Sequence, residues 1–437
     1  MTLLEVVNLV LLAAVGVLLL PIAVFAGECL AAILPRGAGP NRKRGIAYES
    51  PSLALRASAE RATPRTAVLV PAHDEQAGIE RTVRAILATL SAGDRLLVVA
   101  DNCTDQTASL ARQAGAEVVE RTNPDRRGKG YALQCGIQAL ATDPPDALII
   151  IDADCRVEPE TIEVLARRAV AAQRPVQARN LTEVDPWRGR ARATSLEAVS
   201  VLANRFTNLI RPLGLARLAA PCRLTGTGMA FPWSLAAEMQ LAGGNLVEDM
   251  QLGIDLAMQG CLAVYCAEVG VTSGLPAAGR AFVAQRTRWE QGHLRTAARQ
   301  VPRLLAFGLR RRSWPLLAMA ADLSIPPLAL LIVLWLAVTL ASGVAWAVGG
   351  SPLPLLLAAV GGLSLAVSLG LGWAMFCRRH VPLPSLAAVP FYLLRKLPIY
   401  ARMLVRRQDA WVRTDRSVAP SPHARRRSPA DRQAAQR

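Results

Sequence analysis

Cysteine pairs with the spacing of a metal or redox motif are absent from this chain. Its 437 residues include eight cysteines and four histidines, and no two cysteines stand as Cys-x-x-Cys. That absence excludes zinc-finger spacing and a thioredoxin-like motif. No internal repeat divides the chain, which excludes a solenoid or propeller built from repeated units.

Acidic residues are also few relative to basic ones. The chain has 33 Asp and Glu against 50 Lys and Arg, for a formal net charge of +17. This balance suits anionic lipid headgroups, an anionic substrate or nucleic acid. The sequence has no RNP-like motif and no interleaving of aromatic with basic residues, so we predict no nucleic-acid partner.

No basic leader precedes the first long apolar run. Residues Leu3 to Ala26 are almost wholly aliphatic, and the run continues toward Leu34. A secretory signal peptide is the competing interpretation, but its apolar region is shorter and follows basic residues. We therefore predict a retained transmembrane helix over residues 1–34, followed by a linker over residues 35–64.

The C-terminal third contains further apolar segments. Asp322 and Pro326-Pro327 interrupt the stretch after Trp314, so a short interfacial piece should precede a membrane span from about Leu328. A further span over residues 352–377 completes two transmembrane helices within residues 314–377. Residues 378–412 mix apolar and basic side chains and predict an interfacial helix, and residues 413–437 predict a disordered basic tail.

Basic residues set the expected orientation. They follow the first apolar segment, precede the second and follow the third, at Arg36, Arg42 to Arg44, Arg310 to Arg312, Arg378 and Arg379. The positive-inside rule then predicts a multi-pass protein of the inner (plasma) membrane with a cytoplasmic domain. Six cysteines fall in that domain, where thiols stay reduced and serve in packing.

Between residues 65 and 151 short apolar runs alternate with helical patterns. Strands are expected over residues 66–71, 95–100, 117–120 and 148–151, with helices over residues 78–90, 107–114 and 129–140. The alternation predicts an α/β fold with a mostly parallel sheet and helices on both faces. Functional side chains should then lie where the strands end.

Two carboxylates follow the last of these strands. Asp152 and Asp154 stand one residue apart, so strand alternation directs them to one side. Hard oxygen ligands of this kind suit Mg²⁺ or Mn²⁺ carrying a diphosphate. A solvated turn is the alternative.

Other polar residues end strands or open helices. Glu75 and Asp101 suit a base or ribose but also ordinary hydrogen bonds, and Asp105 suits a helix cap. Lys129 opens a helix, where phosphate binds well, although a solvated basic turn has the same composition. The Gly-rich segment Leu224 to Met229 is either a ligand-lining backbone or a turn.

Two more motifs lie downstream. Glu248 and Asp249 open a helix, which also favours acidic residues through its dipole. Gln285, Arg288 and Trp289 stand at i, i+3 and i+4 and share one helix face. A membrane-interface Trp beside a snorkelling Arg is the other interpretation of that face.

In their order these motifs resemble the membrane-embedded family 2 glycosyltransferases, which include cellulose, chitin, hyaluronan and poly-N-acetylglucosamine synthases. The matching segments are Pro71 to Glu75, Asp101 to Asp105, Gly128 to Gly130, Asp152 to Asp154, Glu248-Asp249 and Gln285 to Trp289. The resemblance implies a GT-A fold over residues 65–279 and interfacial helices carrying Gln-x-x-Arg-Trp over residues 280–313.

The resemblance also implies roles for these residues. Glu75 and Asp101 would hold the nucleotide, Lys129 would lie near the diphosphate, and Asp152 would approach the nucleotide sugar. Asp154 would bind Mg²⁺ or Mn²⁺, and Asp249, beside Glu248, would be the general base. Gln285, Arg288 and Trp289 would close over donor and acceptor.

The expected reaction is inverting transfer from a nucleotide sugar, UDP-linked by expectation, to a growing β-linked exopolysaccharide or surface glycan. A hydroxyl needs a base to take its proton, which assigns that role to Asp249. Transfer of one sugar to a membrane lipid, as in enzymes resembling ceramide glucosyltransferase, is the alternative. Val247 and the small number of apolar segments depart from the polymerising relatives and leave processivity and export partners open.

A protein of a different class is the remaining alternative. A transporter would carry inverted repeats and paired charges within its spans, and these are not evident in the sequence. A nucleotide-binding regulator would bind the nucleotide sugar without turnover and would leave the last two motifs without a role.

Overall fold

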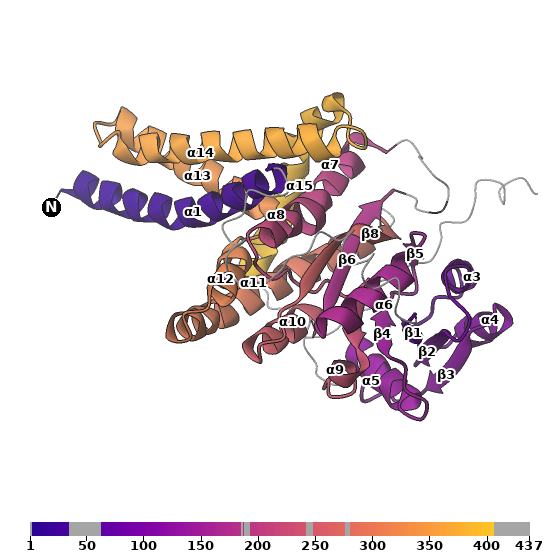
Figure 1. Cartoon of the computed structure of the whole chain (residues 1–437). Helices are drawn as coiled ribbons and strands as arrows, with labels where there is room; N and C mark the ends of the chain where they lie inside the picture. Colours follow the sequence, from indigo (N-terminus) through magenta and orange to yellow (C-terminus); the bar gives the residue numbers. More distant parts are fainter. Residues whose placement is uncertain are drawn as a thin grey trace, which may run out of the picture.

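A computed structural model describes residues 2–34, 63–184, 187, 193–241, 248–275 and 280–405. Within these ranges an α/β domain adjoins a group of long helices (Figure 1). Almost all of the predicted linker and the whole predicted disordered tail lie outside the described residues.

One eight-stranded sheet forms the centre of the domain, in the order β3-β2-β1-β4-β7-β6-β8-β5. Strands β3, β2, β1 and β4 are mutually parallel, as are β6 and β8. Strand β7 runs antiparallel to β4 and β6, and β5 runs antiparallel to β8. The predicted α/β class with a mostly parallel sheet is therefore confirmed. The strands are β1 Thr66–Ala72, β2 Arg95–Asp101, β3 Glu117–Arg121, β4 Ala147–Ile150, β5 Cys155–Val157, β6 Val176–Glu183, β7 Met229–Pro232 and β8 Val264–Gly274.

Helices cover both faces of the sheet because its central strands are buried on both sides. Val68 and Val70 of β1 pack into one cluster with helices α3, α4 and α6. Ala67 and Leu69 pack into a second cluster with α5, α9 and α10. Alternation along the strand thus sends successive apolar side chains into two separate cores. The helices are α3 Ile79–Leu87, α4 Thr107–Gln113, α5 Lys129–Leu140, α6 Thr161–Ala172, α9 Trp233–Ala236 and α10 Glu248–Met258.

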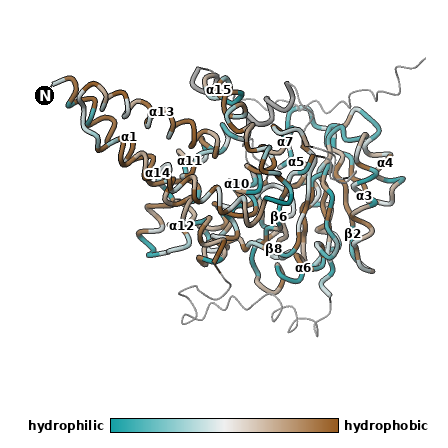
Figure 2. The backbone as a smooth tube through the Cα atoms, turned by 90° about the horizontal axis from the view of Figure 1, so that it is seen from above, coloured by the Kyte–Doolittle hydropathy of each residue, from teal (hydrophilic) through white to brown (hydrophobic). Residues whose placement is uncertain are grey.

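Three of the described helices are long and apolar enough to cross a membrane: Leu3–Ile33, Leu328–Ala347 and Leu353–Cys377. They correspond to α1, α13, and α14 with its final turn η2. The three pack against one another beside the sheet domain (Figure 1) and form a mainly hydrophobic group (Figure 2). Their positions agree with the apolar segments that the sequence shows.

Further helices connect the sheet domain with the apolar helices. Helix α12 is the short piece expected before the second span, and the region predicted as interfacial helices begins as one long helix, α11. Figure 1 shows α8, α11 and α12 between the sheet and the apolar helices. These helices are α7 Ser195–Arg205, η1 Phe206–Ile210, α8 Arg211–Arg217, α11 Arg280–Arg310, α12 Trp314–Ser324, η3 Leu383–Ala388 and α15 Val389–Val405.

A buried ion-pair network joins α1 to the domain. Nε of Arg211 lies 2.7 Å from Oε2 of Glu28, and its Nη2 lies 2.5 Å from Oδ1 of Asp322. Arg223 adds a 2.8 Å contact to Asp322. A Cβ on Gly214 would lie 2.0 Å from the carbonyl oxygen of Glu28, so α8 and α1 touch backbone to backbone. No paired charges are evident within the apolar segments of the sequence, because Arg211 meets Glu28 only in the folded chain.

Replacing Arg211 with Met should destabilise the protein by about 3–5 kcal/mol. Buried Glu28 would lose its ion-pair partner, and buried Asp322 would keep only Arg223. Thermal unfolding of the detergent-solubilised protein measures the loss. Arg65→Met is the matched control, since it breaks an ion pair with Asp143 whose side chains are 53% and 58% exposed. That control should cost less than about 1 kcal/mol. Equal losses in the two variants would contradict a stabilising role for the buried network.

Candidate active site

The carboxyl ends of β1, β2 and β4 share one edge of the sheet because these strands run parallel. Glu75 follows β1, Asp101 ends β2, and Asp152 follows β4. Ligands bind at this edge in open α/β sheets. Glu75, Asp101 and Asp152, three of the site residues predicted from the sequence, therefore lie along the same edge of the sheet.

Asp152 and Asp154 lie in a tight turn and not on the strand itself. Strand β4 ends at Ile150, and the N–H of Cys155 donates to the carbonyl oxygen of Asp152 at 3.1 Å. One carboxylate oxygen from each aspartate and Sγ of Cys155 lie within 4.8 Å of one another. The two carboxylates do converge, but the turn brings them together instead of the strand alternation that we expected.

The chemistry of this turn suits a hard divalent cation held by carboxylates. Burial raises the pKa of the Cys155 thiol well above its ordinary value, and the Asp154 carboxylate raises it further. A thiol is a soft ligand, whereas carboxylate oxygens are the ligands that hard divalent cations prefer. The aspartates fit Mg²⁺ or Mn²⁺, which would supply positive charge to a bound diphosphate.

Lys129 connects this turn to the Gly-rich segment. Its Nζ forms an ion pair with Asp152 and donates to the carbonyl oxygen of Gly226 at 2.6 Å. Burial alone would lower the pKa of Lys129, but the Asp152 carboxylate reverses the effect and leaves the pKa raised. The lysine is therefore a fixed cation in the site, not a loose side chain on a solvated turn.

Asp249 closes the cluster from the first turn of α10. Gly226 has a φ of +87°, and a Cβ placed there would lie 2.9 Å from Oδ2 of Asp249 and 3.5 Å from Nζ of Lys129. The Gly-rich segment thus contacts the Asp249 and Lys129 side chains through bare backbone. Its lining of a ligand stays a prediction. The segment brings together Lys129 and Asp249, which lie more than a hundred positions apart in the sequence.

Substituting Gly226 with Ala should reduce transfer by about 100-fold, because the methyl group would displace the Asp249 carboxylate. Gly93→Ala is a matched control: Gly93 has a φ of +92°, and nothing lies within 4 Å of its added Cβ. Both variants carry the same kind of backbone strain, about 1–2 kcal/mol. Steady-state rates with donor and acceptor distinguish them, and a similar loss in both would assign the effect to strain alone.

The environment of Asp249 makes its carboxylate a stronger base. Burial raises the pKa of Asp249 above its ordinary value, the Lys129 cation opposes that rise, and the Asp152 carboxylate adds to it. The net rise strengthens the affinity of the carboxylate for a proton. This is the change required of a group that removes a proton from a hydroxyl.

The rate should accordingly fall on the acid side at a higher pH than an exposed aspartate would produce. A base at Asp249 would act as carboxylate, so we predict that kcat/KM declines as the pH drops through the raised pKa of Asp249. Lys129→Met should move this limb to still higher pH, because Lys129 lowers the pKa of Asp249. Rates between about pH 4 and pH 8 test both shifts. A limb that moves to lower pH in the variant would contradict the assignment.

Asp101 and Glu75 differ in their surroundings. Asp101 is 5% exposed, and its carboxylate lies 2.5 Å from Nη1 of Arg121 and 3.1 Å from Nδ2 of Asn102. The N–H of Glu75 donates to Oγ1 of Thr107 at 2.8 Å, which ties the turn after β1 to the start of α4. Arg121 is a partner that the sequence alone did not indicate. Nucleotide binding by Glu75 and Asp101 stays a prediction.

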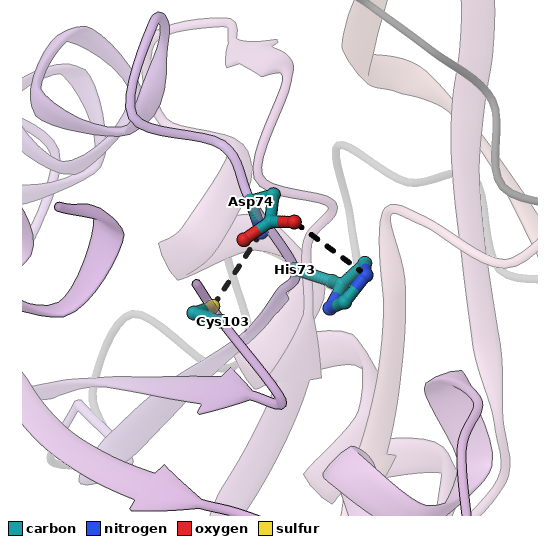
Figure 3. A group of neighbouring side chains, drawn as sticks. All are labelled: His73, Asp74 and Cys103. Carbon is teal, nitrogen blue, oxygen red and sulfur yellow. Dashed lines mark hydrogen bonds and ion pairs between the residues drawn. The ribbon is translucent and has the colours of Figure 1, made fainter. Parts of the chain in front are cut away.

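Figure 3 shows a second group of possible ligand atoms, from His73, Asp74 and Cys103. The N–H of Asp74 donates to Sγ of Cys103 at 3.5 Å, while Oδ1 of Asp74 accepts from the N–H of Thr104 at 2.7 Å. Burial raises the pKa of the Cys103 thiol, which disfavours the thiolate. Nδ1 of His73 lies 2.7 Å from the carbonyl oxygen of Asp101. These contacts join the turns after β1 and β2 and explain the cluster without an ion.

The downstream motif lies on α11. Gln285, Arg288 and Trp289 all belong to this helix, and Trp289 is 47% exposed. The side chains of Glu248, Gln285 and Arg288 fall outside the described part of the structure. Their roles in catalysis and donor closure stay predictions, and the structure places only the helices that bear them, α10 for Glu248 and α11 for Gln285 and Arg288.

Comparisons with other proteins agree with this architecture. A mannosyltransferase from Pyrobaculum calidifontis, solved with GDP-Man and Mn²⁺, superposes with a TM-score of 0.51 at 17% identity, covering 92% of this chain and 99% of that one. The likeness shows that the domain has a GT-A-type fold. Residues 64–292, just over half of the chain, match the family described as Glycosyltransferase like family 2, so the chain belongs to that family.

Proteins related in sequence match shorter parts of this chain than the Pyrobaculum structure does. An uncharacterised glycosyltransferase of Mycobacterium bovis is 37% identical over 127 residues, covering 26% of this chain and 56% of the relative. The protein named "Probable glucomannan 4-beta-mannosyltransferase 10" of Arabidopsis thaliana is 27% identical over 251 residues, covering 52% and 43%. The chain thus spans about half the length of these relatives.

Proposed function

We propose that this glycosyltransferase transfers a hexose from a nucleotide sugar to a glycan or lipid acceptor at a membrane, with inversion at the anomeric carbon. The observation that carries the proposal is the convergence of Asp249, Lys129 and the Asp152–Asp154 turn around Gly226. A base and a fixed cation thereby lie together beside a pair of carboxylates.

Asp249 accepts the proton of the acceptor hydroxyl as the hydroxyl oxygen bonds to the anomeric carbon. The bond between that carbon and the diphosphate breaks, and its electron pair leaves with the nucleoside diphosphate. Direct displacement of this kind inverts the anomeric centre, so an α-linked donor yields a β-linkage. The raised pKa of Asp249 supports its role as base.

Charge on the departing diphosphate requires nearby positive groups. Lys129 is held as a cation by Asp152 and lies at the N-terminus of α5, whose dipole also favours an anion. A divalent cation on Asp154 would supply further charge. The Mn²⁺ of the Pyrobaculum enzyme supports this requirement but leaves the choice between Mg²⁺ and Mn²⁺ open.

The donor is a UDP- or GDP-linked hexose. The family resemblance favours UDP, whereas the plant relative named as a mannosyltransferase and the GDP-Man of the Pyrobaculum complex favour GDP-mannose. GDP-mannose is therefore tested beside UDP-glucose and UDP-N-acetylglucosamine.

The acceptor is a growing β-linked glycan or a membrane lipid. Three helices of membrane-spanning length support a membrane-bound, multi-pass enzyme. Basic residues at the predicted span ends support a cytoplasmic catalytic domain. A synthase-like polymer at the inner membrane is the leading proposal, and addition of one sugar to a lipid is its alternative.

Release of nucleoside diphosphate by the purified protein in lipid nanodiscs tests the proposal. Each donor is supplied with Mg²⁺, Mn²⁺ or chelator, and the products are sized. Metal-dependent release with a long product supports the polymer, and a lipid carrying one sugar supports the alternative. Donor binding without release from any donor, in nanodiscs that contain lipid and oligosaccharide acceptors, would overturn the proposed activity.

A further inference from the structure

The C-terminal helix α15 packs across the helix that carries the Gln-x-x-Arg-Trp motif. Residues Glu290 of α11 and Lys396 of α15 stand 106 positions apart in the sequence and form an ion pair. Glu290 is 8% exposed and Lys396 is 3% exposed. Lys396 lies more than a hundred residues beyond the segment that matches the family.

The pair is built into the contact between the two helices. Nζ of Lys396 lies 5.7 Å from the ring centroid of Tyr392, which is itself buried one turn earlier on α15. Removal of Lys396 would leave the Glu290 carboxylate as an uncompensated buried charge, which is costly. On its other side α15 is exposed and apolar, at Phe391, Leu394 and Leu397. The charged residue therefore points into the protein and not toward solvent or lipid.

Glu290 directly follows Trp289 and belongs to an anchored turn of α11. His293, three residues later on the same helix face, has Nε2 2.9 Å from the carbonyl oxygen of Ile325 and is 8% exposed. Trp289 is 47% exposed. The Glu290 face of α11 is thus fixed to α15 and to the segment after α12, while Trp289 projects from a different face.

We infer that Lys396 is a positioning residue for α11: through its buried ion pair with Glu290 it fixes the turn that carries Arg288 and Trp289. The helix α15 is then part of the transferring unit and not a mere membrane attachment. The inference concerns the position of α11, and it rests on the proposed function only where it predicts transfer rates.

Amide hydrogen exchange of the full chain in nanodiscs measures this positioning without any need for activity. Lys396→Met should raise exchange in peptides covering residues 285–293 by about tenfold or more, because local opening becomes easier, while the sheet strands keep their protection. The charge exchange E290K/K396E should restore the exchange rate to within about threefold of the parent. Arg395→Met removes an exposed cation from the same helix. This control should change neither the exchange of residues 285–293 nor that of the sheet strands.

Transfer kinetics provide a second readout. Lys396→Met should lower kcat by about 10- to 100-fold with little change in the KM for donor, and E290K/K396E should recover most of kcat. The exchange pattern separates this effect from a loss of fold, because unfolding would also raise exchange in the sheet strands.

Two results would overturn the inference. One is parental exchange over residues 285–293 in Lys396→Met. The other is increased exchange spread evenly over the sheet strands, because Lys396 would then serve the fold as a whole. Should no donor give turnover, the exchange experiment still decides the inference, so its failure is distinguishable from failure of the proposed function.

Discussion

Replacing Asp249 with Asn should lower kcat by about 10²- to 10⁴-fold, because the amide cannot accept the proton of the acceptor hydroxyl. Asn has nearly the same size as Asp, so the substitution preserves the close packing against Gly226. A Cβ added to Gly226 would lie only 2.9 Å from Oδ2 of Asp249. Donor affinity should change little, since the lost interaction belongs to the transition state. Diphosphate release and direct donor titration measure the two quantities separately.

Asp255→Asn is a matched control for that experiment. Asp255 lies on the same helix and accepts a 2.9 Å hydrogen bond from Nε2 of Gln251. The control should retain at least about half of the parental rate. Turnover of Asp249→Asn at the parental rate would remove Asp249 from the role of base and direct attention to Glu248.

Replacing Asp154 with Asn should raise the Mn²⁺ concentration needed for half-maximal rate and lower kcat by about 10²- to 10³-fold. The change removes one of two carboxylates whose oxygens lie within 4.8 Å of each other. Asp154 is a cleaner test than Asp152, because Asp152 also holds Lys129. Mn²⁺ titration of diphosphate release, with Mn²⁺ binding followed by electron paramagnetic resonance, measures both effects.

Chelation of the divalent cation should abolish transfer by the parent protein, and added Mn²⁺ or Mg²⁺ should restore it. Asp143→Asn, at a side chain that is 58% exposed and pairs with Arg65, provides the control and should keep the parental metal requirement. An unchanged metal requirement in Asp154→Asn would contradict the role assigned to this carboxylate.

Local periodicity explains why the elements of the domain could be predicted. Buried strands such as β1 form short continuous apolar runs, and helices such as α5 repeat apolar residues every three to four positions. The predicted boundaries of α5, Lys129 and Leu140, are those of the structure. Apolar helices of membrane-spanning length were equally visible, because length and composition are properties of the segment alone.

The candidate site was only partly visible, because its residues come from separate segments. Asp249 and Lys129 were candidates by residue type, but nothing in either local sequence places them together at Gly226. The convergence of Asp152 and Asp154 was expected from strand alternation, and a turn after Ile150 produces it instead. Cys155 was expected only to pack in the domain, and Arg121 drew no attention, because an ion-pair partner has no distinctive pattern in the sequence.

By itself the sequence determined the α/β class, the apolar helices and the types of residue available for catalysis, since each follows from composition or from spacing within one segment. Only the tertiary structure decided which charges meet. Arg211 with Glu28, Lys129 with Asp152, and Lys396 with Glu290 pair across 183, 23 and 106 positions. Such pairs depend on how separate segments pack, because the attraction between charges acts over a few ångströms in space and is independent of distance along the chain.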